Sequence, residues 1–152
     1  VAGALTTAGT TDVNGGTVAG TTTNTGTLTA ENGAIFAAGI TNSGSIKMAS
    51  STVGKDVTNL SEGSFSAQTS LIGGNITNSG TANVSSASWV IGNVTNNGNA
   101  DVSGSVVNGT TTNTGTFTAE DGTLAAVANN GGTATLSDTT AGAVTNASGA
   151  TF

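Results

Sequence analysis

Apolar and polar residues alternate along short stretches of this chain, and the alternating stretches return at regular intervals. Ile40-Thr41-Asn42-Ser43-Gly44 shows the recurring motif: an aliphatic residue, Thr, Asn, a small residue and Gly. Alternation with a period of two is typical of a β-strand, because successive side chains of a strand point to opposite sides. The motif therefore predicts a strand with Ile40 and Asn42 inward and with Thr41 and Ser43 outward.

The motif and its degenerate forms recur along the whole chain. They lie at residues 5–9, 22–26, 40–44, 57–59, 76–80, 94–98, 111–115, 129–131 and 144–146, in steps of 16 to 19 residues. A coil of this length cannot bury its apolar side chains alone, but stacked coils share a continuous core. We therefore expect an all-β fold, a parallel β-solenoid (β-helix) of about nine coils of 16–19 residues, forming a single domain over residues 1–152.

The helix is expected to be right-handed, because parallel strands joined by crossovers favour that hand. A left-handed helix built from hexapeptides stays open as an alternative, since Ile40 and Ile46 are six residues apart. A longer period overlies the coils: residues 1–65 resemble residues 90–152. Its offset equals five coils, so a five-coil block is repeated.

Two further apolar lines complete the predicted interior. After the Gly of each motif the alternation continues, and it places one large apolar residue per coil on an inward line: Leu28, Ile46, Phe65, Phe117 and Leu136. A third apolar group is expected to close each coil: Ile35, Val53, Leu71, Trp89, Val106 and Leu124. Trp89 is assigned to the core on this basis, with a sugar-stacking platform as the alternative.

The inward asparagines are the main candidate site. They are Asn24, Asn42, Asn59, Asn78, Asn96, Asn113, Asn130 and Asn146. An amide carries both a donor and an acceptor, so amides stacked at the coil spacing can form a hydrogen-bonded ladder. A buried amide without partners would be costly. The alternative is that Asn precedes Gly only because Asn-x-Gly forms turns.

Composition narrows the classes of function. The chain has 24 Gly, no Pro and no Cys, and its only basic residues are Lys47 and Lys55, which leaves a net charge of −6. An acidic surface does not suit nucleic acid, and no apolar run is long enough to cross a bilayer. We therefore expect neither a nucleic-acid partner nor membrane insertion. Glycine suits the several tight corners that each coil needs.

Little in the sequence favours catalysis. There is no His, Cys or Arg, the residues that most often serve as base, nucleophile or phosphate ligand. Adjacent acids occur only at Glu120-Asp121, which we interpret as a solvated turn, although paired carboxylates can hold calcium or hydrolyse sugars. The expectation is a protein that is not an enzyme and that uses no cofactor or metal.

The motif, continued as aliphatic-x-Asn-x-Gly-x-aliphatic-x-Ala, resembles the repeats of filamentous haemagglutinin and of autotransporter passenger domains. Residues 22–30, 40–48, 94–102 and 111–119 carry it or a close variant. The resemblance implies an elongated bacterial adhesin or surface fibre, located outside the cell or at the cell surface. It also implies attachment to a glycan or protein of a host surface or matrix.

The leading hypothesis is an extracellular structural or adhesive β-solenoid, either a stalk segment of an adhesin or a filament subunit. No residues that would cap the stack are evident at either end, which predicts end-to-end self-association or a place within a longer fibre. Two alternatives remain open. An outward line of threonines could bind ice: Thr23, Thr41, Thr58, Thr77, Thr95, Thr112 and Thr145. A carbohydrate-active β-helix is the other.

Overall fold

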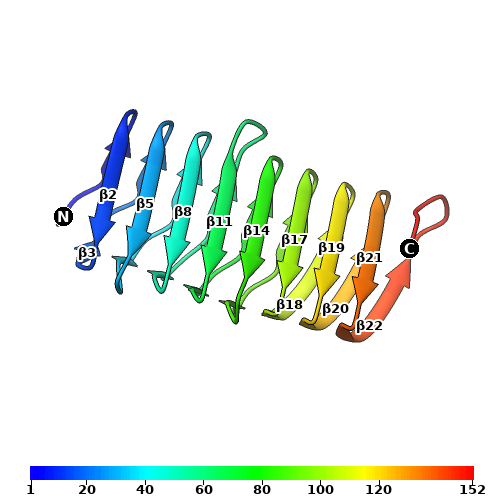
Figure 1. Cartoon of the computed structure of the whole chain (residues 1–152). Helices are drawn as coiled ribbons and strands as arrows, with labels where there is room; N and C mark the ends of the chain where they lie inside the picture. Colours follow the sequence, from blue (N-terminus) through cyan, green and yellow to red (C-terminus); the bar gives the residue numbers. More distant parts are fainter.

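The chain is a straight rod of stacked coils. The computed structural model describes residues 1–152, and all of its regular elements are β-strands. Figure 1 shows the coils side by side, with the N-terminus at one end of the rod and the C-terminus at the other. The chain has no helix long and apolar enough to span a bilayer.

Each coil contains a three-residue strand, a five-residue strand and a two-residue strand, in that order. The first strands are β1 (Leu5–Thr7), β4 (Thr22–Asn24), β7 (Ile40–Asn42), β10 (Val57–Asn59), β13 (Ile76–Asn78) and β16 (Val94–Asn96). The second strands are β2 (Thr10–Asn14), β5 (Thr27–Glu31), β8 (Ser45–Ala49), β11 (Ser64–Gln68), β14 (Thr81–Ser85), β17 (Asn99–Ser103), β19 (Thr116–Glu120) and β21 (Thr133–Ser137).

The third strands are β3 (Thr17–Val18), β6 (Ile35–Phe36), β9 (Thr52–Val53), β12 (Leu71–Ile72) and β15 (Trp89–Val90). Toward the C-terminus the third strand of one coil runs on into the first strand of the next. These continuous strands are β18 (Val106–Asn113), β20 (Thr123–Asn129) and β22 (Thr140–Asn146), and the pairing of β18 with β20 shifts register between Val107 and Thr110.

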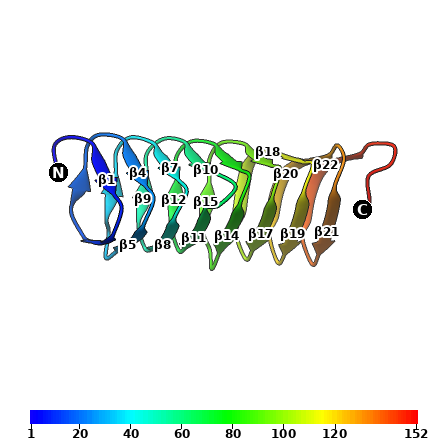
Figure 2. The same cartoon turned by 90° about the horizontal axis from the view of Figure 1, so that it is seen from above.

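All strand pairs are parallel, and each strand pairs with its counterparts in the neighbouring coils (Figure 2). The second strands form an eight-stranded sheet, here called the front sheet, which faces the viewer in Figure 1. The first and third strands form the back sheet, which β18 joins into one fourteen-stranded sheet. The expected all-β parallel β-solenoid is confirmed, with about eight full turns rather than nine, because the last level contributes only β22 and a bridge between Thr133 and Thr151.

The core fills the space between the two sheets with 26 buried apolar residues. In the front sheet the inward residues form two columns, and Leu28, Ile46, Phe65 and Phe117 lie in one of them, fully buried. The assignment of Leu136 to that column is wrong, because Ala134 pairs with Phe117 while Leu136 pairs with Ala119 in the second column. Here the larger inward residue has moved to the other column, so alternation is kept and only the position of the bulk differs.

The assignment of third-strand residues to the core is wrong at four positions. Ile35, Leu71, Trp89 and Val106 point outward, and the residues that follow them are buried instead. A two-residue strand has one inward and one outward position. In these strands both positions are apolar, as in Leu71-Ile72, so the hydrophobic pattern does not specify which side chain faces the core. Val53 and Leu124, the other two residues of that group, are buried as expected.

The corner glycine of the motif permits the coils to approach closely. A Cβ atom on Gly98 would collide with the carbonyl oxygen of Gly80 in the preceding coil, and Gly44 and Gly115 meet the same obstacle. These obstacles are backbone atoms, which cannot move without breaking the stacking. Gly9 has the same place in the first coil, where nothing lies within 4 Å of such a Cβ.

We predict that Gly98→Ala destabilises the rod while Gly9→Ala does not. The added methyl group should cost about 2 kcal/mol or more at Gly98, because it overpacks a rigid backbone contact. Chemical denaturation followed by circular dichroism measures both variants. Equal effects at the two positions would contradict a role for this close approach.

Two buried hydroxyl groups lack hydrogen-bond partners. Thr22 and Thr111 take the inward position at which other coils carry Leu, Ile or Val, and their Oγ1 atoms are buried without a partner. Burying an unpaired hydroxyl is unfavourable. Valine has nearly the same shape without that cost.

Thr111→Val is expected to raise the free energy of unfolding by about 1 kcal/mol, because it removes the desolvation penalty of the hydroxyl. The control is Thr112→Val, at the neighbouring outward position, which should change stability by less than about 0.5 kcal/mol. Thermal melts of both proteins test this, and a lower melting temperature for Thr111→Val would refute it.

Candidate functional site: an amide ladder inside the rod and an apolar ridge on its surface

The inward asparagines stack into one continuous ladder along the rod. Asn24 Nδ2 donates to Asn42 Oδ1 at 2.7 Å, and the same bond links each level to the next up to Asn129 and Asn146. The seven bonds in this series span 2.7 to 2.9 Å. At the N-terminal level Thr7 replaces Asn and donates its hydroxyl to Asn24 Oδ1.

Each ladder amide also fixes the corner beside it. Asn42 Nδ2 lies 3.1 Å from the carbonyl oxygen of Gly44 in its own coil and 3.0 Å from that of Ser64 in the next coil. Asn42 Oδ1 accepts from the Gly44 backbone N–H at 3.2 Å. The ladder and the Asn-x-Gly turn are therefore one arrangement, although the sequence presented them as alternatives.

The structure places seven of the eight expected asparagines in the ladder and excludes Asn130. Asn24, Asn42, Asn59, Asn78, Asn96 and Asn113 are buried, and Asn146 accepts at the last level from an exposed position. Asn130 is exposed, and the ladder position in its coil belongs to Asn129. The reason is one extra residue in this corner: Thr133 aligns with Thr116, so Gly132 rather than Gly131 takes the corner position.

The structure contains a second polar ladder, made of serines, which the sequence did not predict. Ser51, Ser70, Ser88 and Ser105 are buried at the corner before the third strand. The backbone N–H of Ser51 donates to Ser70 Oγ at 3.2 Å, and Ser70 and Ser88 continue the series at 3.0 and 3.2 Å. The sequence does show a small residue directly before each third strand. Serine is common throughout the chain, however, so this residue alone did not indicate a buried ladder.

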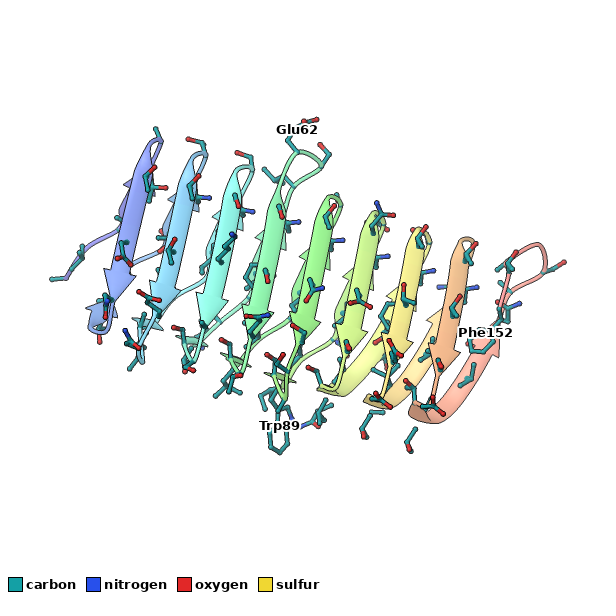
Figure 3. The ribbon with its side chains drawn as sticks, viewed as in Figure 1. Glu62, Trp89 and Phe152 are labelled. Atoms are coloured by element: carbon teal, nitrogen blue, oxygen red, sulfur yellow. The ribbon has the colours of Figure 1, made fainter.

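Charge is divided unequally between the two faces of the rod. The strands of the back sheet contain no charged residue. Those of the front sheet contain five: Asp12, Glu31, Lys47, Asp101 and Glu120. Glu62, on the enlarged loop labelled in Figure 3, Asp121 and Asp138 lie at corners. Lys55 and Asp56 are exposed between β9 and β10, on the same side as the back sheet. The front face therefore carries most of the charge, and the back face carries one residue of each sign.

The back face carries an outward apolar ridge, which comprises the exposed residues Ile35, Leu71 and Trp89 and the partly exposed Val106. These residues lie in one outward column, whose complete order along the rod is Thr17, Ile35, Thr52, Leu71, Trp89, Val106, Thr123 and Thr140. Trp89 is 49% exposed and projects from the rod (Figure 3). The prediction of a core role for Trp89 is wrong, and its indole is free to make contacts outside the chain.

A threonine column lies beside the amide ladder on the same sheet. It contains Thr6, Thr23, Thr41, Thr58, Thr77, Thr95, Thr112 and Thr145, with Ala128 between the last two. The side chains point away from the core because each lies between two inward residues of its strand, an aliphatic residue or Thr before it and an Asn, or Thr7 in the first coil, after it. The expected outward line is thus unbroken over seven consecutive levels.

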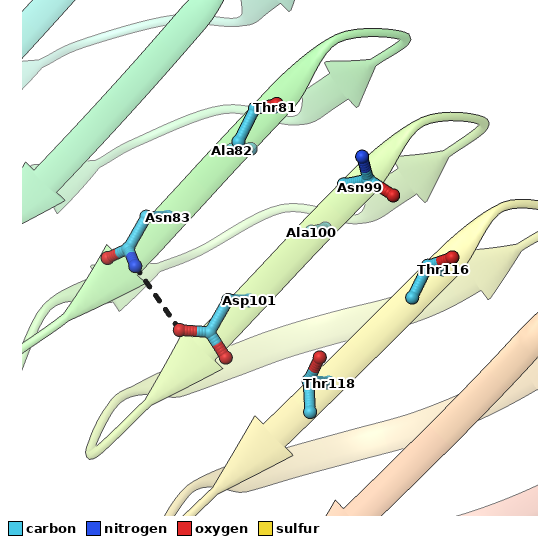
Figure 4. Close-up of a pocket in the computed structure, with 8 residues that line it drawn as sticks. All are labelled: Thr81, Ala82, Asn83, Asn99, Ala100, Asp101, Thr116 and Thr118. Carbon is cyan, nitrogen blue, oxygen red and sulfur yellow. Dashed lines mark hydrogen bonds between the residues drawn. The ribbon is translucent and has the colours of Figure 1, made fainter.

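The front sheet has a shallow hollow over β14, β17 and β19, which Figure 4 shows with its lining residues. Asp101 lies in it and accepts a hydrogen bond from Asn83 Nδ2 at 3.2 Å (Figure 4). Partial burial removes water from the carboxyl group and raises the pKa of Asp101. Ala82 and Ala100, the small inward residues of β14 and β17, also line the hollow.

The adjacent acids Glu120 and Asp121 do not lie together with further side chains that could bind a metal ion. Glu120 is the exposed last residue of β19, and Asp121 follows it in the corner with a φ of 52°. No group of three or more Asp and Glu side chains in the chain could hold a metal ion. Comparisons with protein-family models, curated proteins and solved structures found no match.

The register of the ladder can be tested at two adjacent residues. We predict that Asn129→Ala lowers the free energy of unfolding by about 2–3 kcal/mol, because it removes bonds to Asn146, Gly132 and Thr151 and leaves Asn113 short of an acceptor. Asn130→Ala should change it by less than about 0.5 kcal/mol. Urea unfolding measures both, and the opposite order would restore the register expected from the sequence.

Proposed function

We propose that this chain is an extracellular structural and adhesive β-solenoid, used as a stalk segment of a surface adhesin or as a subunit of a filament. The observation that carries the proposal is the continuous amide ladder. It repeats the same inter-coil contacts at every level, so that the rod keeps one cross-section along its whole length. A rod of this kind holds its outer columns at fixed spacing over about 40 Å, roughly nine levels of 4.8 Å.

Support for adhesion comes from the apolar ridge. Exposed apolar residues that gather in one column on a soluble protein commonly mark a contact surface, and Trp is the residue type most enriched at binding hot spots. The repeat motif adds the resemblance to secreted bacterial adhesins, which supports a location outside the cell or at its surface. Candidate partners are glycans or proteins of a host surface or matrix.

End-to-end association is part of the same proposal. Backbone pairing and the amide ladder bind any coil to the next in the same way, so the contacts that join coils within a chain can also join coils of two chains. The ladder has a direction, because each amide donates toward the C-terminal side. Chains would therefore stack head to tail.

Electron microscopy and an attachment assay test the proposal together. Negative staining of the purified chain at micromolar concentration should show filaments or uniform short rods, and beads coated with the chain should attach to host-cell or glycan surfaces. Beads coated with Trp89→Ser protein are the matched control and should attach less, since the indole is removed from the ridge while the core is unchanged. The function would be refuted if beads coated with the parent chain attached no better than uncoated beads and the chain formed no filaments.

The threonine column supports a second proposal, binding to ice. Its hydroxyl and methyl groups repeat at the strand spacing of about 4.8 Å on an uncharged sheet, which suits a regular solid surface better than a single small ligand. Inhibition of ice recrystallisation is the readout. Thr77→Lys should abolish it and Thr118→Lys, on the front sheet, should not; an inactive parent chain would exclude this proposal.

A further inference from the structure

The apolar ridge points to a specific partner, a second copy of this chain. We propose that two rods pair side by side and antiparallel through their back sheets, with a two-fold axis at Leu71. This inference rests on the proposed role of the ridge as a contact surface and names one partner for it. Two features of the rod support it: the order of residues along the ridge, and the lack of charged residues in the strands of the back sheet.

The order of side chains along the ridge is self-complementary about Leu71. Reversing the column about this residue sets Leu71 against Leu71, and sets Ile35 against Val106. The same reversal sets Trp89 against Thr52, so that the largest side chain of the ridge meets one of the shortest. One level further out, Thr17 meets Thr123. A two-fold axis always pairs residue i with j and j with i, so each of these contacts occurs twice.

Neighbouring positions for the axis fit less well. An axis at Trp89 would press two indoles against each other and leave Ile35 facing Thr140. An axis midway between Leu71 and Trp89 would leave both Ile35 and Val106 facing threonines. Only the axis at Leu71 sets Ile35, Leu71 and Val106 against apolar side chains. It also sets the large Trp89 against the short side chain of Thr52.

Charge supports this face and disfavours the other. The chain has a net charge of −6, so two copies repel unless their acids are kept apart. In the back-to-back arrangement the front-sheet acids lie behind the interface by at least one sheet spacing, about 10 Å. That is about the Debye length at physiological ionic strength, so their repulsion is largely screened. The acid nearest the interface, Asp56, lies between β9 and β10 and would face Asn93, which carries no charge.

The area available is adequate for a stable pair. A back sheet about 40 Å long and about 20 Å wide offers roughly 800 Å² per rod, which is the contribution of each partner to an interface of standard size. Leu71, Trp89 and Ile91, an exposed residue directly after β15, would lie at its centre, where truncation costs most. Both rods would still present their front sheets and ends.

The decisive experiment is a charge exchange at the axis. Sedimentation equilibrium of the full chain at about 1–100 µM should show a dimer, and Leu71→Asp and Leu71→Lys should each weaken it at least tenfold, since each sets like charges together on the axis. An equimolar mixture of the two variants should restore the dimer, because the charges are then opposite. Both variants should keep the parent circular dichroism spectrum, since Leu71 lies outside the core.

Cysteine cross-linking adds a geometric test, because the chain has no cysteine. Under mild oxidation Leu71→Cys should form a disulfide-linked dimer, while Gln68→Cys, exposed on the front sheet of the same coil, should not. A monomeric parent chain at 100 µM would overturn the pairing. A dimer that persists in Leu71→Asp would also overturn it and would indicate end-to-end contact. A monomer whose Trp89 fluorescence changes on addition of glycans would overturn it too, and would identify a glycan as the partner of the ridge.

The pairing and the proposed function can fail separately. A monomeric chain whose coated beads still attach would overturn the pairing and leave the adhesive function in place. If the chain pairs through Leu71 and its unpaired Leu71→Asp variant, whose Trp89 is uncovered, neither attaches nor forms filaments, the pairing stands and the function is refuted. The two readouts use the same purified protein.

Discussion

The spacing between coils is the constraint on which the rest of this rod depends. Parallel strands pair at about 4.8 Å, and every inward side chain must tolerate a neighbour at that distance above and below. An asparagine amide meets this demand, because it offers an acceptor on one side and a donor on the other. Asp would stack carboxylates against each other, and Leu would leave the corner carbonyl oxygens without a donor. The ladder bonds of 2.7–2.9 Å show how well the amide fits.

The same spacing explains why Asn and Gly occur together in the motif. In most coils the chain turns directly after the strand, and the ladder amide donates to the carbonyl oxygen of the glycine two residues further on. A turn that tight brings the corner against the backbone of the preceding coil, where there is no room for a Cβ atom. Where the corner is longer, as between Asn59 and Gly63, the amide still bonds to the residue that ends the turn. The contact with that residue matters more than the length of the loop.

The sequence predicted the inward and outward residues of a strand more reliably when the strand was longer. Three- and five-residue strands carry enough alternation to fix which side chains face inward, and their positions follow from the sequence. The two-residue strands carry none when both residues are apolar, so Leu71 and Trp89 could not be placed without the structure. Asn130 was misplaced for a related reason: two adjacent asparagines satisfy the motif equally well, and only pairing with the coil below distinguishes them.

Stacking also accounts for the unusual composition. Each outward residue has neighbours from its own column at about 4.8 Å on both sides, and like charges placed opposite each other in a sheet are destabilising. In the front-sheet columns no two acids occupy adjacent levels: Asp12 is next to Thr29, and Asp101 lies between Asn83 and Thr118. Thr, Ser and Asn stack on any neighbour without this penalty. A regular rod with one residue per level in each column therefore favours a low charged fraction, which is 7% in this chain. The strands of the back sheet, which contain no charged residue, follow this rule most strictly.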